Sequence, residues 1–318
     1  MLEYPIKSVH GHTLSELEDI LEDSCDSFDD IVVLESTSQG GWSNINIRGS
    51  ASGLDFILKL PWSTEKYLSN PYERLYKLGL QFARLNIASH PIEVGRLDDS
   101  CGTPFFLIEY VDGTTRSTLT DANEDEIHSL KESLRILKEQ KPSGIPKYES
   151  PSDYLLANHE QVDNHPWLRR ASDEAILLLD KYNSLFPKVE SAMDIIGYWS
   201  GDVMHGDLWI PNIVFRKSSE VLLLDFDACA YGDSRYDLTR LIEGDELDDV
   251  PMLIPDEDLN FVNSLRPLVL SYVIDWSINR LLSMESGIVE SNLNTIELRQ
   301  AIIGHTKEKI ARLTTLLH

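Results

Sequence analysis

The chain has 318 residues, 42% of them hydrophobic, and is long enough to bury two substantial cores. Its 53 acidic residues outnumber its 28 basic ones, and the net charge of −25 argues against a nucleic-acid surface and against binding to anionic membranes. The cysteines, Cys25, Cys101 and Cys229, are widely separated, which excludes a disulfide framework or a CxxC metal site. No amino-terminal signal and no apolar run near twenty residues is present, so we expect a cytoplasmic protein.

The amino-terminal part predicts a helix over 13–22 and then two short strands, over 31–34 and 45–48. The segment between the strands contains two glycines, and glycines let backbone amides approach phosphate groups closely. An ordinary hairpin turn would have the same composition. The candidate phosphate-binding residues of this segment are Gly40, Gly41, Ser43 and Asn44.

The run 54–60 predicts a third strand with a single lysine. Because side chains alternate along a strand, Lys59 shares a face with Ile57, while the neighbouring apolar residues face the other way. A lysine in so apolar a strand needs an anionic partner, unless the strand lies at an edge and the lysine points into solvent.

The next elements are a helix and another apolar strand. Asn70 and Pro71 predict the helix start, with Asn70 as its cap and Pro71 at the first helical position. Glu73 lies three residues after Asn70, where a glutamate commonly closes a capping box. The run 104–113 then predicts an apolar strand that ends in a turn.

Beyond residue 113 the sequence is mostly helical in pattern. Apolar residues recur at helical spacing over 125–140, 171–186, 261–282 and 295–317, while prolines punctuate the region between 140 and 205. The chain therefore predicts a small β-rich lobe and a larger helical one, with the break near Gly113.

The segment 205–227 is the most informative for chemistry. Phosphoryl transfer from a magnesium nucleotide needs a group that positions the acceptor hydroxyl, for which Asp207 is the candidate, and oxygen ligands for the metal. Asn212 and Asp225 suit Mg²⁺, a hard ion that prefers oxygen. The runs 213–215 and 221–224 predict a hairpin, whose antiparallel pairing would bring Asn212 and Asp225 together. Taken singly, Asp207 could be a turn cap and Asp225 a strand-end carboxylate.

These motifs resemble those of the aminoglycoside phosphotransferase and choline kinase-like superfamily, the small-molecule branch of the protein-kinase fold. The resemblance implies an α+β, two-lobe fold. Residues 1–113 would form a β-rich nucleotide-binding lobe with one key helix, and 114–318 a mainly helical lobe with the catalytic loop and the acceptor site. The matching stretches are His205-Gly206-Asp207-Leu208-x3-Asn212-Ile213, Asp225-Phe226-Asp227 and Gly232-Asp233-x3-Asp237-Leu238.

The resemblance also implies roles in the helical lobe. Asp207 would be the catalytic base, and Asn212 and Asp225 would hold the metal. His205 and Asp237 would support the catalytic loop, although Asp237 could simply open a helix with an acidic first turn.

In the amino-terminal lobe the resemblance implies a nucleotide site. Lys59 would contact the α- and β-phosphates and Ile57 would cover the adenine. Glu73 would pair with Lys59, which competes with its possible role in the capping box. The backbone of Glu109 and Val111 would hydrogen-bond the adenine edge, although an ordinary buried strand would look the same.

Three departures from protein kinases favour a small-molecule acceptor. Gly206 stands where protein kinases usually carry an arginine, Asp227 replaces the glycine of Asp-Phe-Gly, and no Ala-Pro-Glu motif follows. The stretch from Asp227 to Gly232 is too short for an activation loop.

The acidic stretch 243–258 holds eight acidic residues and no basic one. It would attract a cationic acceptor, but a solvated acidic loop would have the same composition. The candidate acceptor residues are Glu243, Asp245 and Glu246.

The sequence therefore predicts an ATP- and Mg²⁺-dependent phosphotransferase acting on a hydroxyl of a small polar molecule, with cationic aminoglycosides, choline and amino-alcohols among the candidates. GTP in place of ATP stays open, and the sequence does not predict the oligomeric state. Trp209 is shared with the fructosamine and ketosamine kinases, so a ketosamine or other sugar kinase is the alternative. An alternative of another class is a nucleotide-binding pseudokinase or scaffold.

Overall fold

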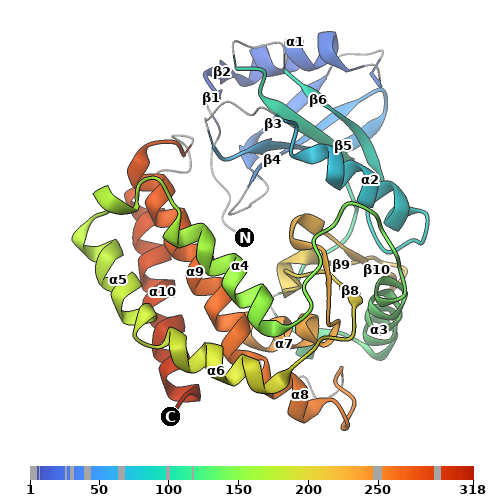
Figure 1. The fold of residues 1–318 in the computed structure, drawn as a ribbon. Helices are drawn as coiled ribbons and strands as arrows, with labels where there is room; N and C mark the ends of the chain where they lie inside the picture. The colour runs from blue at the N-terminus through green and yellow to red at the C-terminus, as the bar shows by residue number, and fades with distance from the viewer. Residues whose placement is uncertain are drawn as a thin grey trace. The chain divides into compact units, whose positions relative to one another are not determined.

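The chain divides into two compact units, which are described separately (Figure 1). The first consists of Met1–Thr114, Val214–Phe226 and Ile288–Asn294, and the second of Thr115–Ile213, Asp227–Gly287 and Thr295–His318. The computed structural model describes residues 6, 8–25, 27–28, 32–38, 44–63, 69–97, 101–116, 118–245, 253–289 and 295–318.

The first unit is built around a five-stranded antiparallel sheet of order β3-β4-β5-β7-β6. Its strands are β3 (Val33–Ser38), β4 (Asn44–Ala51), β5 (Leu54–Pro61), β6 (Pro91–Arg96) and β7 (Pro104–Glu109). The central strand β5 pairs with β4 along its whole length. Phe56, Leu58 and Leu60 on one face of β5 are fully buried, as the predicted alternation requires. Lys59 lies on the opposite face, within the sheet and not at its edge.

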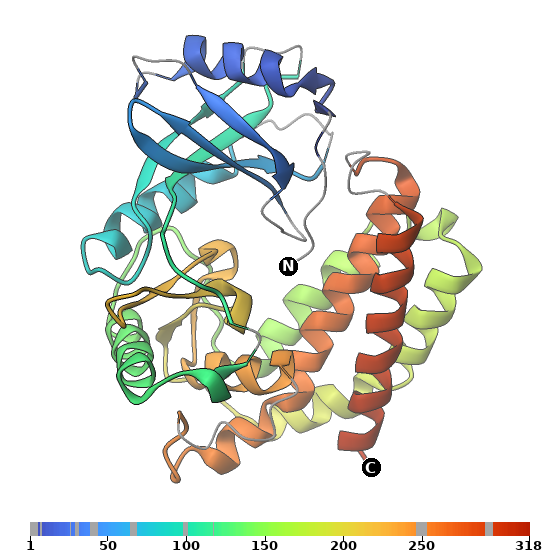
Figure 2. The same ribbon diagram turned by 180° about the vertical axis from the view of Figure 1, so that it is seen from behind.

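Two helices accompany this sheet (Figure 2). Helix α1 (Leu14–Ser24) follows the short pair β1 (Ser8–Val9) and β2 (His12–Thr13) and contacts β3. Thr13 and Glu16 form a capping box at its start. Helix α2 (Tyr72–Ala83) packs on β6 and β7 through an apolar stripe. The strand β6 was not predicted, because its run contains too few apolar residues to stand out.

The first unit also contains residues of a two-stranded sheet, formed by β9 (Ile213–Phe215) and β10 (Val221–Leu223), as the sequence predicts. The N–H of Thr114 donates to the carbonyl of Phe215 at 2.9 Å, and the N–H of Phe215 donates back at 3.0 Å. The N–H of Leu223 donates to the carbonyl of Ile87. These hydrogen bonds join β9 to the segment after β7 and β10 to the segment after α2.

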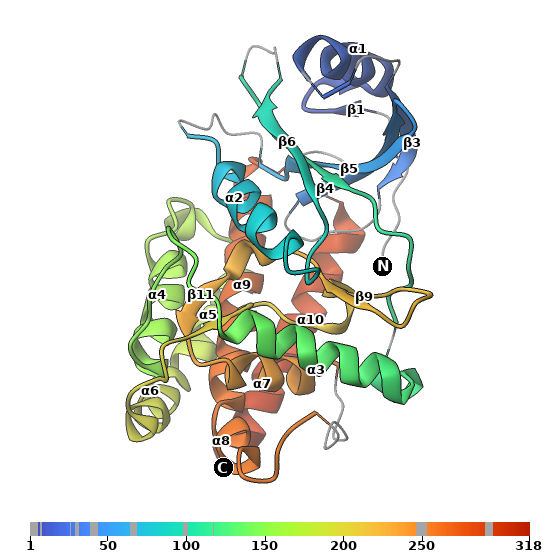
Figure 3. The same cartoon turned by 90° about the vertical axis from the view of Figure 1, so that its right-hand side faces the viewer.

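The second unit is mainly helical (Figure 3). Its longest elements are α9 (Arg266–Ser286), which is buried on nearly every side, and α10 (Ile296–Leu316). Helix α9 packs against α4, α5, α6, α7 and α10. The other helices are α3 (Glu124–Lys138), α4 (Pro151–Asp163), α5 (Asp173–Asn183), α6 (Phe186–Ile196), α7 (Arg235–Asp245) and α8 (Leu259–Ser264), and the strands β8 (Asp202–Met204) and β11 (Ala230–Gly232) pair antiparallel.

Two of the prolines that punctuate this region in the sequence mark helix starts in the structure. Pro151 and Pro187 lie in the first turns of α4 and α6, where the missing N–H breaks no hydrogen bond. These two helices were not predicted from the sequence. The single helix predicted over 261–282 is two helices in the structure, because α8 ends at Ser264 and α9 begins at Arg266, with Pro267 in its first turn.

Of the three cysteines, Cys25 and Cys229 are buried and Cys101 is exposed. Among the described helices, none combines the length and the apolar character needed to cross a membrane.

Gly113 offers a test of the junction between the chain after β7 and β9. A Cβ at this position would lie 2.4 Å from Cγ1 of Val214 and 2.8 Å from the carbonyl oxygen of Phe215. We predict that Gly113→Ala lowers the free energy of unfolding by about 1 to 3 kcal/mol, measured by urea denaturation. The matched control is Gly304→Ala on the exposed side of α10, where a Cβ has open space and should stabilise the helix by up to about 1 kcal/mol. Equal effects of the two substitutions would contradict this packing.

Candidate active site

The loop between β8 and β9 carries the predicted catalytic residues in the second unit. Gly206 has a φ of +82°, and a Cβ there would lie 2.2 Å from the carbonyl oxygen of Ala228. Only glycine fits a left-handed backbone so close to another peptide. This contact explains why the position cannot carry the arginine found in protein kinases.

Asp237, at the start of α7, holds this loop through its backbone. Its two carboxylate oxygens accept hydrogen bonds from the N–H groups of His205 at 2.7 Å and Gly206 at 2.9 Å. Asp237 is 2% exposed, and the imidazole of His205 is fully buried. Burial raises the pKa of Asp237 to about 7 from its ordinary value of 3.8, against the opposing effect of the two backbone N–H groups. Asp237 thus lies in the first turn of a helix and also fixes the shape of the catalytic loop.

Asp207 itself is bound by an arginine that the sequence analysis did not single out. Arg240, one turn after Asp237 on α7, donates from Nε and Nη2 to the same oxygen, Oδ1 of Asp207, at 3.2 and 3.0 Å. The Asp207 side chain is 29% exposed, and its Oδ2 makes no hydrogen bond to a described residue. Residues three apart on a helix share a face, which was the available signal for Arg240 beside Asp237.

Asn212 ends the same loop with its amide oriented by the backbone. Its Nδ2 donates to the carbonyl oxygen of Asp207 at 2.9 Å. The amide oxygen therefore points away from this bond, and it makes no hydrogen bond to a described residue. An amide oxygen that accepts no hydrogen bond from the described part of the protein is suited to a hard cation.

In the first unit, Lys59 pairs with Asp225. Nζ of Lys59 lies 2.9 Å from Oδ1 of Asp225, and the lysine is 9% exposed. Asp225 follows β10 with a φ of +64°, a left-handed conformation that is strained for a residue with a side chain. A buried ammonium and a carboxylate in a strained turn are the kind of pair that binds phosphate and metal ions.

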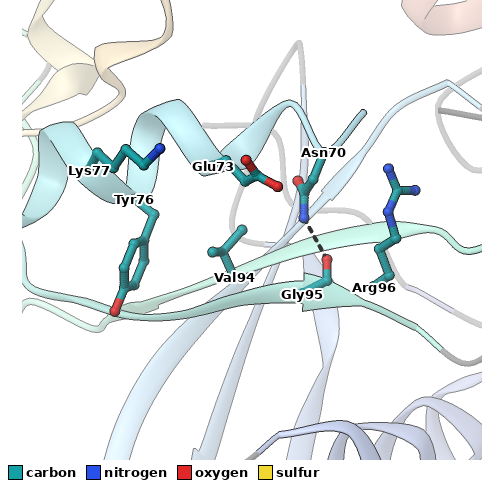
Figure 4. A pocket seen from close by; sticks show the side chains of 7 residues that line it. All are labelled: Asn70, Glu73, Tyr76, Lys77, Val94, Gly95 and Arg96. Atoms are coloured by element: carbon teal, nitrogen blue, oxygen red, sulfur yellow. Dashed lines mark hydrogen bonds between the residues drawn. The ribbon is translucent and has the colours of Figure 1, made fainter. Parts of the chain in front are cut away.

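Glu73 has neither of its two expected roles, ion-pair partner of Lys59 or capping-box residue with Asn70. Glu73 is exposed and lines a pocket of about 540 Å³ between α2 and β6 with Lys77 and Arg96 (Figure 4). Its carboxylate forms neither an ion pair with Lys59 nor a hydrogen bond to the backbone of Asn70. Asn70 instead accepts from the N–H of Tyr72 at 2.9 Å and donates to the carbonyl of Gly95. These two hydrogen bonds, one to the start of α2 and one to β6, take the place of a capping box.

The adenine-edge candidates differ in how free their backbones are. The N–H of Glu109 donates to the carbonyl of His90 at 2.8 Å, and its carbonyl accepts from the hydroxyl of Ser89 at 2.5 Å. Val111 makes no backbone hydrogen bond to a described residue. The backbone of Val111, and not that of Glu109, is therefore open to a ligand.

The other predicted nucleotide residues lie near the face of Lys59 or outside the described part of the chain. Ile57 is half-buried on the face it shares with Lys59. Asn44 is buried, and its side-chain oxygen accepts from the hydroxyl of Tyr72 at 2.8 Å. Gly40, Gly41 and Ser43 lie outside the described residues.

Glu243 has a structural environment that does not suit an acceptor site. Its side chain is 1% exposed and forms ion pairs with Arg266 of α9 and, at 2.6 Å, with Arg312 of α10. It joins α7 to the two longest helices and offers no open face to a substrate. The side chain of Asp245 and the whole of Glu246 lie outside the described residues.

Asp237 gives a pH-dependent prediction. Because its pKa is raised in the folded protein, its neutral form favours folding, and this stabilisation is fully present below about pH 4 and lost as the pH rises through about 7. Asp237→Asn stays neutral throughout. We predict that wild type loses on the order of 4 kcal/mol of unfolding free energy relative to this variant across that range, most of it between about pH 4 and 7 in urea titrations.

The control for this experiment is Asp202→Asn, which changes a more exposed carboxylate in β8 that accepts from the hydroxyls of Ser200 and Ser234. Because Asp237 is intact in this variant, the loss of unfolding free energy with rising pH should persist in it. Parallel curves for wild type and Asp237→Asn would contradict the raised pKa.

Comparisons with known proteins bear on the family and the fold. A family model described as the phosphotransferase enzyme family matches residues 37–257, more than half of the chain. No curated protein matches the sequence significantly.

Solved structures share the fold at low sequence identity. A spectinomycin phosphotransferase in complex with ADP and spectinomycin has a TM-score of 0.58 and 11% identity, and the match covers 95% of this chain and 98% of that one. A choline kinase from Streptococcus pneumoniae has a TM-score of 0.58 and 14% identity, with 93% and 98% covered. An ethanolamine kinase from Plasmodium vivax has a TM-score of 0.59 and 13% identity, with 89% and 81% covered.

The predicted two-lobe, kinase-like fold and the predicted superfamily are thus confirmed. The chain belongs to the phosphotransferase enzyme family.

Proposed function

We propose that this protein transfers the γ-phosphoryl group of ATP to a hydroxyl of a small polar molecule, with Asp207 as the catalytic base. The observation that carries the proposal is the state of Asp207. A loop anchored by Asp237 presents its carboxylate, one oxygen is held by Arg240, and the other makes no hydrogen bond to a described residue. Such a group can accept the proton of a hydroxyl held within hydrogen-bond reach.

The proposed reaction has one bond-forming and one bond-breaking event at phosphorus. The acceptor oxygen bonds to the γ-phosphorus, the bond from the γ-phosphorus to the oxygen bridging to the β-phosphate breaks, and ADP leaves. The hydroxyl proton passes to the carboxylate of Asp207. Because phosphoryl transfer needs little covalent help, orientation of the hydroxyl is the main contribution that Asp207 can make.

Asn212 and Asp225 are the residues we propose as magnesium ligands. The amide oxygen of Asn212 is turned away from its own hydrogen bond, and Asp225 offers a partly exposed carboxylate. Both are oxygen donors, which Mg²⁺ prefers, and the bound ion would neutralise charge on the phosphates.

Lys59 is the residue we propose for the nucleotide phosphates. It is buried in β5 and paired with a carboxylate, so its ammonium is already held in place before a nucleotide arrives. The backbone of Val111 makes no hydrogen bond to a described residue, which suits the adenine edge, and Ile57 has a half-buried side chain that suits contact with the ring. A hinge read through its backbone would accept ATP or GTP.

The acceptor class is proposed from charge and from the family. The chain carries a net charge of −25, which favours a cationic acceptor such as an aminoglycoside, choline or another amino-alcohol. A ketosamine or other sugar is the second candidate, because the chain shares Trp209, directly after the stretch 205–208, with the fructosamine and ketosamine kinases.

We predict that Asp207→Asn lowers turnover by about 10²- to 10⁴-fold and leaves nucleotide affinity unchanged. Lys59→Ala should instead lower the nucleotide affinity, because it removes the cation proposed to bind the phosphates. Turnover is measured by coupled ADP release, and affinity by isothermal titration with Mg-ATP. Unchanged turnover in Asp207→Asn would remove Asp207 from the mechanism.

A panel of acceptors in the ADP-release assay tests the substrate class. Aminoglycosides, choline, ethanolamine, ketosamines and simple sugars form its arms, each with ATP and with GTP. If the protein binds Mg-ATP but releases no ADP with any acceptor, a nucleotide-binding pseudokinase becomes the better account.

A further inference from the structure

Arg240 binds the proposed catalytic carboxylate in a one-sided way. Its Nε and Nη2 both donate to Oδ1 of Asp207, and Oδ2 receives no hydrogen bond from a described residue. A bidentate pair that used both carboxylate oxygens would leave neither oxygen free. The observed arrangement restrains the carboxylate and keeps one oxygen available.

The environment of Arg240 keeps this contact charged and rigid. Arg240 is 8% exposed, and its guanidinium lies 5.7 Å from the ring centre of Trp209. Burial by itself would lower the pKa of Arg240, but the carboxylate of Asp207 and the nearby hydroxyls of Tyr236 and Tyr272 raise it. The guanidinium is therefore a permanent cation with little freedom to move away.

One helix turn connects this contact to the anchor of the loop. Asp237 accepts from the backbone of His205 and Gly206, and Arg240, three residues later on α7, holds the side chain of Asp207. The same rigid element thus fixes the loop backbone and the carboxylate that the loop presents. A rigid element holds a reacting group more tightly than a second loop could.

We propose that Arg240 is a positioning residue, which holds Oδ1 of Asp207 so that Oδ2 is the oxygen that takes the proton of the acceptor hydroxyl. The inference rests on the proposed function of Asp207 and deepens it. Arg240 then raises turnover by fixing the direction of the free oxygen and does not bind the acceptor itself.

A direct role in substrate binding is the rival account. Nη1 of Arg240 makes no hydrogen bond to a described residue, so it has donors to offer to a substrate. A second rival is an inhibitory ion pair that must break before Asp207 can act. The two rivals and the proposal predict different results in a double-mutant cycle.

The experiment compares Arg240→Met in the wild-type background and in Asp207→Ala, with the acceptor identified by the panel. In the wild-type background kcat should fall roughly 10- to 100-fold, the loss expected for a hydrogen bond to a charged group. The KM for the nucleotide and its dissociation constant should stay within about twofold, since Arg240 is proposed to act on Asp207 alone. In the Asp207→Ala background the same substitution should cause no further fall in kcat.

Arg240→Lys keeps the charge but not the forked geometry, so it should restore part of the lost kcat. This variant also keeps the cycle informative if Arg240→Met does not fold. Arg116→Met is the matched control, because it removes another arginine of the second unit, which binds both oxygens of Glu126 at α3. It should leave kcat within about twofold of wild type.

Each other outcome overturns a defined claim. An equal fold loss in both backgrounds shows that Arg240 acts on the substrate or on the fold and rejects the inference. A rise in kcat in Arg240→Met supports the inhibitory ion pair and rejects the positioning role of Arg240. An unchanged kcat also rejects the positioning role. Full activity in Asp207→Ala instead rejects the proposed function, which is distinguishable from failure of the inference.

Discussion

The buried carboxylate of Asp237 is the constraint on which the catalytic loop depends. Its two oxygens receive the N–H groups of His205 and Gly206, at 2.7 and 2.9 Å. Two peptide groups in a buried loop would otherwise be left without partners, which is costly in a low-dielectric interior. Gly206 takes a left-handed conformation against the carbonyl of Ala228, so a side chain at this position would displace the loop.

This anchor carries an energetic penalty that the protein tolerates. Burial favours the neutral form of Asp237 and brings its pKa to about 7, although two donors favour the charged form. The two hydrogen bonds from Arg240 to Oδ1 of Asp207 also hold the loop against α7. We infer that the fold accepts some loss of stability here because the loop carries Asp207 and Asn212, and functional sites commonly hold such strain.

Motifs with a fixed spacing were predictable from the sequence, and long-range contacts were not. The strand pair β9 and β10 and the strand bearing Lys59 follow from local periodicity, which the sequence contains in full. The helices α4 and α6 were not predictable from the pattern, because prolines usually interrupt a helix, whereas Pro151 and Pro187 lie in the first turn, where the missing N–H breaks no hydrogen bond.

Partners distant in sequence could not be predicted for the charged residues. Lys59 pairs with Asp225, 166 residues away, and Glu243 meets Arg266 and Arg312 in the interior. Nothing local marks Glu243 as buried, so the acidic stretch suggested a substrate site. Arg240 was missed for the opposite reason: its place one turn after Asp237 was visible, but its contact with Asp207 depends on how the loop folds back onto α7.

The most direct test of the account is phosphorus-31 NMR of the protein with Mg-ATP and the acceptor panel. The account predicts one new phosphomonoester signal that grows at the rate at which ADP appears and that is lost in Asp207→Ala. Release of inorganic phosphate alone, or a phosphomonoester formed equally well by Asp207→Ala, would contradict it.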